Sequence, residues 1–221
     1  MAGNLCAAEL FDLRECPVPW AFDGKQYPWE ILPEIGRLVL ELAARLGEDY
    51  TQISEHIWVG KGTTIAPTAV LIGPAIIGRG CEIRPGAYIR ENVIVGDGVV
   101  IGNSTELKNA ILFNGVQVPH FNYVGDSVLG ARAHLGAGAI CSNLKSTGEL
   151  VKVRTGTEVI PTGLRKFGAI VGDRAEIGCN AVLNPGTVVG RESIIYPLSS
   201  VRGVIPPRTI FKSAGCLVPR T

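Results

Sequence analysis

His120, one of only three histidines in this 221-residue chain, lies in an apolar, glycine-punctuated stretch that runs from Lys108 to Ser127. Tyr123 follows His120 by three residues, and Lys108 precedes it by twelve. Histidine is the side chain best suited to take up a proton near neutral pH, and lysine offers a point charge to an anion. Either this stretch carries acid–base chemistry beside an anion, or His120 is a hydrogen-bonded structural residue.

A repeat of six residues indicates the strands that must position these residues. Aliphatic side chains recur at every sixth position from Val59 to Leu107 and again from Val171 to Val201, with one shortened step between the two runs. A helix of period 3.6 cannot keep every sixth residue on one side, whereas short parallel strands stacked into a prism can. A β-sandwich would instead show strands and turns of varying spacing. The pattern predicts a mainly β fold, a left-handed parallel β-helix of hexapeptide repeats, over residues 56–212.

Three segments lie outside the repeat. Residues 1–55 form an N-terminal extension in which "PEIGRLVLELAARLGED" has helical apolar spacing, with Pro33 where a first turn tolerates it. We expect this helix to pack its apolar face onto the β-helix or a neighbouring subunit, and of the positions on the β-helix we favour one that caps its open end. Residues 144–168 lose the register and alternate instead, which predicts a two-stranded excursion carrying Lys152, Arg154, Arg165 and Lys166. Residues 213–221 are expected to be a tail.

Composition excludes several classes of protein. The net charge is +1, and the basic residues form no dense stripe with interleaved aromatics, so nucleic acid is an unexpected partner. Six cysteines are widely spread without a CxxC pair, which favours reduced thiols over disulfides or zinc. The first sixteen residues contain acidic groups and no long apolar run, so neither a signal peptide nor a membrane span is expected. A cytoplasmic protein fits these features.

Four segments of the sequence, one of which contains His120, resemble a known family. The segments "IRPGA", "NSTELKNAILFNGVQVPHFNYVGDS", "LGAGAICSN" and "GLRKFGAIVGD" resemble the acetyltransferase domain of bifunctional N-acetylglucosamine-1-phosphate uridyltransferases, with the last segment closer to archaeal sugar-1-phosphate members. The likeness extends from about Trp58 to Lys212, and no Gly-rich pyrophosphorylase motif precedes the repeats. The resemblance therefore implies a stand-alone acyltransferase domain.

What the resemblance implies can be placed residue by residue. His120 of "PHFNY" matches the histidine that takes the proton from the sugar amine, and Asn143 matches the asparagine that orients sugar and base. Ala137 matches the alanine whose backbone N–H faces the thioester oxygen. The matched substrate-binding residues are Tyr123 and the phosphate-binding Arg84, Lys108 and Lys166. Three positions depart from the family: His134 stands for an asparagine beside the sugar, Leu144 for a tyrosine, and Cys179 for a serine beside the coenzyme.

The implied activity is N-acetylation of an amino-sugar 1-phosphate, such as glucosamine 1-phosphate, with acetyl-CoA as cosubstrate, no metal and a homotrimeric assembly. Without the resemblance, Arg84 and Lys108 are surface charges, Tyr123 a packing residue and Asn143 a turn residue. A non-catalytic sugar-phosphate or nucleotide-sugar binding module on the same fold is the alternative. A zinc carbonic anhydrase would need the three histidines, His56, His120 and His134, to converge on one metal.

Overall fold

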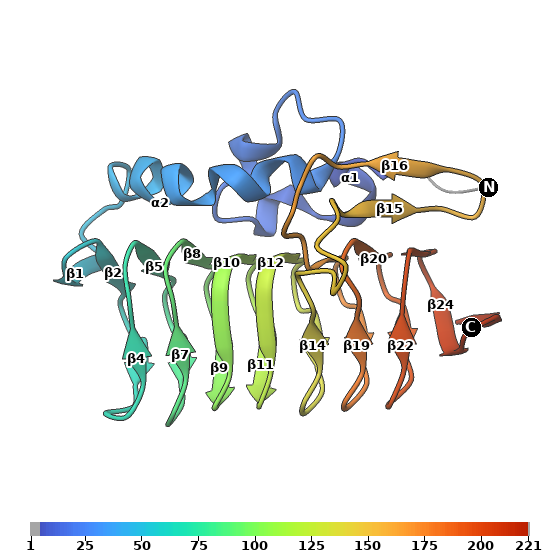
Figure 1. Ribbon diagram of the computed structural model, residues 1–221. Coiled ribbons are helices and arrows are strands. Elements are labelled where there is room, and N and C mark those ends of the chain that lie inside the picture. The colour runs from blue at the N-terminus through green and yellow to red at the C-terminus, as the bar shows by residue number, and fades with distance from the viewer. Residues whose placement is uncertain (1–4, 221) are drawn as a thin grey trace.

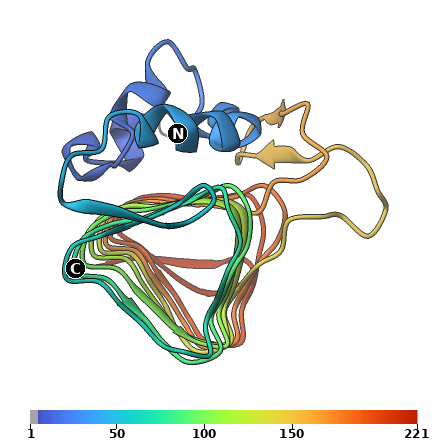
Figure 2. The same ribbon diagram turned by 90° about the vertical axis from the view of Figure 1, so that its left-hand side faces the viewer.

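The structure, a computed structural model, describes residues 5–220. Its main body is a left-handed parallel β-helix of triangular cross-section, seen along its axis in Figure 2. We number its three faces in the order in which the chain passes through them. The predicted fold is confirmed, and the helical segments lie outside the triangle (Figures 1 and 2).

The first face contains the strands β2 (Ile57–Gly60), β5 (Ala75–Ile77), β8 (Val93–Val95), the later parts of β10 (Glu106–Leu112) and β12 (Tyr123–Leu129), β17 (Ala169–Val171), β20 (Thr187–Val189) and β23 (Val204–Ile205). The second face contains β3 (Thr64–Ile65), β6 (Glu82–Ile83), β9 (Val100–Asn103), β11 (Gln117–His120), β13 (His134–Leu135), β18 (Glu176–Ile177), β21 (Ile194–Ile195) and β24 (Thr209–Ser213).

The third face contains β4 (Val70–Leu71), β7 (Tyr88–Ile89), the first parts of β10 and β12, β14 (Ile140–Cys141), β19 (Val182–Leu183) and β22 (Ser200–Val201). Two strands pair antiparallel at the ends of the β-helix: β1 (Tyr50–Ser54) with β2, and β25 (Cys216–Pro219) with β24. Four residues of the segment expected to be a tail, Cys216–Pro219, thus form a strand of the sheet.

The six-residue register fills the interior of the triangle, as predicted. Its aliphatic residues are buried, apart from Ile65 and Leu71 in the first coil, which are half-buried at the open end. Ile89, Ile101, Leu107, Leu135 and Leu183 are fully enclosed. Because each coil buries three aliphatic residues, one from each face, against the coils on both sides, the stack forms one continuous apolar core.

The N-terminal segment covers the first face. It comprises α1 (Ala7–Leu10), the 3-10 helices η1 (Leu13–Glu15), η2 (Pro19–Phe22) and η3 (Pro28–Glu34), and α2 (Ile35–Ala43). Outward-facing side chains of the first face, including Ile76, Ile94 and Ile111, are buried beneath it. The helix α2 packs its apolar face onto the β-helix, as one expectation had it, but the position at the open end was wrong: α2 lies along the side, over β5, β8 and β10 (Figure 1).

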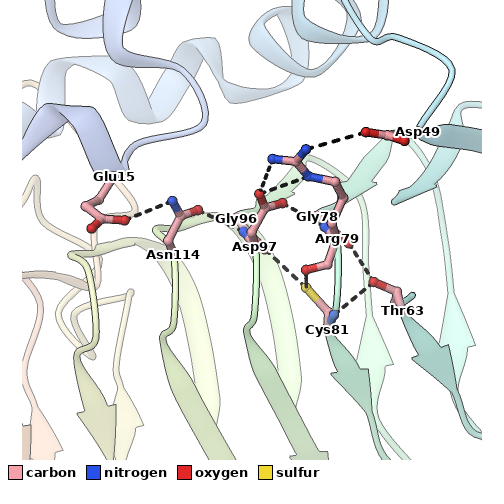
Figure 3. Close-up of polar contacts among 9 residues, drawn as sticks. All are labelled: Glu15, Asp49, Thr63, Gly78, Arg79, Cys81, Gly96, Asp97 and Asn114. Atoms are coloured by element: carbon pink, nitrogen blue, oxygen red, sulfur yellow. Dashed lines mark hydrogen bonds and ion pairs between the residues drawn. The ribbon is translucent and has the colours of Figure 1, made fainter. Parts of the chain in front are cut away.

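A row of polar contacts fixes one edge of this cover at the corner between the first and second faces (Figure 3). Arg79 pairs with Asp97 at 2.7 Å, and the Asp97 backbone N–H donates to the Asn114 side-chain oxygen at 2.8 Å. Asn114 Nδ2 in turn donates to Glu15 Oε2 at 3.0 Å. The N-terminal segment is therefore held by hydrogen bonds at this corner as well as by apolar packing.

The excursion is a hairpin of β15 (Lys152–Arg154) and β16 (Val159–Pro161), as the alternation predicted. It leaves the β-helix after Asn143 and returns at Gly168, at the corner between the third and first faces (Figure 2). Val151, Val153 and Phe167 are buried, and the Phe167 ring lies 5.7 Å from that of Trp29. The hairpin and the N-terminal segment therefore share one apolar cluster.

All six cysteines are free thiols, and Cys16, Cys81 and Cys141 are buried. Among residues 5–220, no helix has the length and apolar character needed to cross a bilayer.

Candidate functional site

His120, Ala137 and Cys179 form a column at the corner between the second and third faces. The register aligns β11, β13 and β18 from coil to coil, and it brings these three residues to equivalent positions. The Gly138 N–H donates to the His120 carbonyl at 3.0 Å, and the Asn180 N–H donates to the Ala137 carbonyl at 2.8 Å. The column therefore places the three predicted residues side by side along one edge of the β-helix.

The His120 side chain is exposed and makes no hydrogen bond with any residue in the described range 5–220. The next residue, Phe121, has φ of +53°, a conformation that is uncommon for a bulky side chain, and is 61% exposed. The half-exposed Ala137 likewise has a backbone N–H without a hydrogen-bond acceptor among the described residues. This corner therefore presents a free imidazole and a free backbone donor to solvent.

A second group lies at the other edge of the third face. Asn143 Nδ2 donates to Tyr123 Oη at 3.1 Å and to Asp126 Oδ2 at 2.5 Å. Asn109 Nδ2 donates to Asp126 Oδ1 at 3.0 Å, and the Asp126 side chain is buried. The Asp126 carboxylate thus holds two amides and fixes the orientation of Asn143 toward Tyr123.

Gly125 creates the space in which this group meets. A Cβ at Gly125 would lie 2.5 Å from Tyr123 Oη and 2.9 Å from Asn143 Nδ2, closer than any real contact. Burial raises the pKa of Tyr123, and the Glu106 and Asp126 carboxylates raise it further. Tyr123 therefore keeps its proton at neutral pH and can donate it in a hydrogen bond to a ligand.

Lys108 lies beside Gly125 in the parallel register of β10 and β12. Its ammonium is 3.9 Å from Glu91 Oε1, and its side chain is only 18% exposed. Lys166 is exposed and forms an antiparallel bridge with Leu144, while the Phe167 N–H donates to the Asn143 carbonyl at 2.9 Å. The excursion thereby returns Lys166 to the neighbourhood of Asn143.

Arg84 and His134 are not brought to this edge within one chain. Arg84 directly follows β6 on the second face, where its guanidinium donates to both Glu82 carboxylate oxygens at 3.0 Å. This pairing raises the pKa of Arg84. His134 Nδ1 lies 2.8 Å from Glu176 Oε2 on the same face. The predicted residues therefore divide between the third face and the second face across the His120 corner.

The three histidines are also separate. His56 lies in the turn between β1 and β2, and His134 is paired with Glu176, so neither converges on His120. Within residues 5–220, no three His, Cys, Asp or Glu side chains are grouped to hold a metal ion.

Sequence reasoning missed Asp126, Asn109 and Gly125. Asp126 and Asn109 each have φ of +47°, and Asp and Asn are common at such corners for conformational reasons alone. Their types therefore looked like turn residues. Nothing in the sequence distinguished an Asp or Asn whose side chain holds Asn143 in place from one that only forms a turn.

Replacing Asp126 by Ala should destabilise the protein by about 1–3 kcal/mol, because the Asn109 and Asn143 amides lose a buried acceptor. Asp126→Asn keeps one acceptor oxygen and tolerates the same backbone conformation, so it should cost less. Urea unfolding of the two variants measures the difference. Equal stability of Asp126→Ala and the unmodified protein would contradict the bracing role.

Comparison with known proteins places these features in a family context. The family model described as the GMPPB C-terminal domain matches residues 71–162. The chain is 33% identical over 183 residues to a bifunctional sugar-1-phosphate nucleotidylyltransferase/acetyltransferase of Sulfurisphaera tokodaii, covering 80% of this chain and 45% of that protein. It is 34% identical over 172 residues to the bifunctional protein GlmU of Methanococcus vannielii, covering 76% and 41%.

The resemblance expected from the motifs is thus confirmed, and the chain spans less than half the length of these curated relatives. Among solved structures, Arabidopsis UDP-N-acetylglucosamine acyltransferase is 13% identical with a TM-score of 0.46, covering 72% of this chain and 62% of that one. The acetyltransferase domain of Neisseria gonorrhoeae PglB, in complex with acetyl coenzyme A, is 18% identical with a TM-score of 0.38, covering 83% and 64%.

Proposed function

We propose that this chain is an acetyl-CoA-dependent N-acetyltransferase acting on an amino-sugar 1-phosphate, with His120 as general base. One observation carries the proposal: the third face is bordered at one edge by the His120 column and at the other by Lys108, Tyr123 and Asn143. A base and a cationic edge thus flank one surface. The bifunctional acetyltransferase relatives support the reaction class.

The proposed chemistry follows from the positions of these groups. The exposed His120 imidazole takes the proton from the sugar amine as the amine attacks the thioester carbonyl. The free Ala137 N–H stabilises the oxyanion that develops on that carbonyl, and Cys179 lies one coil further along the coenzyme edge. The thiolate of coenzyme A then leaves and is protonated. Lys108 and Lys166 attract the sugar phosphate, while Tyr123 donates to the sugar and Asn143 Oδ1 accepts from it.

We assign Arg84 and His134 to the same reaction through a neighbouring copy in a homotrimer. Both lie on the second face, and a second face packed near the third face of another copy would add them to its site. Exposed apolar side chains at the third face and its corner support such packing: Tyr88, Phe121, Ile140 and Leu198, the last of which is 81% exposed. The free thiols fit action in the cytoplasm.

Sedimentation velocity tests the assembly. The protein should sediment as a trimer at micromolar concentration, because isolated exposure of this apolar surface is unfavourable. Leu198→Asp should shift the protein toward monomer. If the unmodified protein sediments as a stable monomer, the site shared between neighbouring copies is contradicted.

The substrate assignment is tested by Lys108→Ala. Removing a charged contact to phosphate should raise KM for the sugar phosphate about tenfold to hundredfold and leave KM for acetyl-CoA nearly unchanged. Lys61→Ala, which removes an exposed charge from the first coil, is the matched control and should change neither constant. An equal rise for both substrates in Lys108→Ala would contradict a phosphate contact.

A further inference from the structure

A cavity of about 330 Å³ lies between the excursion and the later coils of the β-helix. It begins beside the candidate site, because Ser142 and Leu144, which flank Asn143 in the sequence, both line it. It ends at Arg202 and Gly203, after β22. Neither Lys108 nor Lys166 is part of its lining, so the cavity is distinct from the cationic edge already described.

Two glycines dock the hairpin directly onto the coils at this place. Gly186 and Gly203 have φ of +82° and +78°. A Cβ at Gly186 would lie 2.9 Å from the Lys152 carbonyl oxygen, and one at Gly203 would lie 2.6 Å from the Arg154 carbonyl oxygen. The backbone of β15 therefore rests against two successive corners, which leaves little freedom in its position.

The alternation of β15 then decides which side chains face the cavity. Val151 and Val153 are fully buried in the cluster shared with the N-terminal segment. Lys152 and Arg154 point the other way, are exposed and line the cavity. The hairpin thus supplies two cations from one side of a strand whose position is fixed.

The β-helix supplies the opposite wall. The register pairs Cys141 with Leu183 and Leu183 with Val201, so the residues that follow them form a column of Ser142, Asn184 and Arg202. At the usual strand spacing, Ser142 and Arg202 are about 10 Å apart along the axis. The Asn184 amide already donates to Ser200 Oγ and to the Val201 carbonyl, so this wall offers a ligand the Ser142 hydroxyl and the Arg202 guanidinium.

The charges of the cavity are unbalanced. Lys145, Lys152, Arg154 and Arg202 line it, against a single carboxylate, Glu149. Glu149 is 3.9 Å from Lys145, whereas Lys152, Arg154 and Arg202 make no ion pair within the described part of the chain, residues 5–220. Three unpaired cations that converge on a concave surface favour a ligand with more than one negative charge.

We propose that this cavity binds the phosphate or diphosphate group of an organic phosphate. The assignment of the ligand to the acyl-coenzyme A cosubstrate rests on the proposed function, whereas the binding itself does not. Two sources share the chemistry: the phosphates of an acyl-coenzyme A, and the diphosphate of a nucleotide-linked sugar. Either ligand carries its phosphates at a distance from its reacting atom, as the separation of this cavity from His120 requires.

Calorimetric titration of the full chain with inorganic pyrophosphate tests the binding. Arg202→Gln and the double variant Lys152→Gln/Arg154→Gln should each weaken pyrophosphate binding about tenfold to hundredfold at fixed ionic strength, since each removes charged hydrogen bonds. Lys61→Gln is the matched control for net charge and should bind as the unmodified protein does. Absence of binding at millimolar pyrophosphate, or equal affinity in all variants, would overturn the proposal.

Titration with coenzyme A, pantetheine and uridine diphosphate distinguishes the sources. If the ligand is the coenzyme, Arg202→Gln weakens coenzyme A binding and leaves pantetheine binding unchanged. If it is a nucleotide-linked sugar, the same variant weakens uridine diphosphate binding instead. Pyrophosphate binding that depends on Arg202 in a protein without acetyl transfer would refute the proposed function and leave the phosphate site standing.

Discussion

Replacing His120 by Asn should lower the turnover of acetyl transfer by about a hundredfold to ten-thousandfold, the usual contribution of a positioned base. Asn has a similar polarity but cannot accept the amine proton. KM for both substrates should change little, because a base acts only as the proton leaves. Steady-state kinetics with acetyl-CoA and the accepted sugar phosphate measures both constants.

The same substitution should leave stability almost unchanged. The His120 side chain is exposed and makes no hydrogen bond within residues 5–220, so its removal leaves no buried group unpaired. His56→Asn, at an exposed histidine in the turn before β2, is the matched control and should retain full turnover. A His120→Asn protein with normal turnover, or one that loses activity only through unfolding, would contradict the role of His120 as base.

Replacing Phe113 by Ala should destabilise the protein by about 3–5 kcal/mol. Phe113 is completely buried where the first face turns, and its ring lies 4.9 Å from that of Phe11 and 6.3 Å from that of Phe22. Truncation leaves a cavity between the β-helix and the N-terminal segment. The melting temperature should fall by about 6–20 °C for a chain of this length.

Leu40→Ala provides the control for this prediction. Leu40 is an apolar residue on α2 that is 48% exposed, so its truncation should change stability by no more than about 0.5 kcal/mol. Differential scanning calorimetry on both variants makes the comparison. An unchanged melting temperature for Phe113→Ala would show that the N-terminal segment does not share a core with the β-helix.

The coil itself could be predicted because one physical constraint repeats in every turn. Each of the three faces of a coil must enclose an aliphatic residue, such as Ile77 or Leu183, and a period of six provides one for each face. The place of α2 could not be predicted from its own amphipathic spacing, which fits an open end as well as a flank. The strands carried the missing signal: "AII" at Ala75–Ile77 and "VIV" at Val93–Val95 are apolar on both sides, as strands covered on both sides must be.

The candidate site was predictable where it depended on position along the coil. His120 and Ala137 share a corner because the register aligns them, and the motif spacing had already singled them out. The separation of Arg84 and His134 from Lys108 depended on which side of a corner each residue falls, and the motifs do not state this. The role of Asp126 could not be predicted from the sequence, because it depends on hydrogen bonds with residues 17 positions away on either side.

The central claim is tested most directly by mixing the purified protein with acetyl-CoA and a panel of amino-sugar 1-phosphates. Free thiol and the mass of the sugar product are followed together. The account predicts that thiol release matches the formation of an N-acetylated sugar phosphate for at least one member of the panel, including glucosamine 1-phosphate or a close relative. Tight binding of coenzyme and sugar phosphate without thiol release would contradict it and identify a non-catalytic binding module.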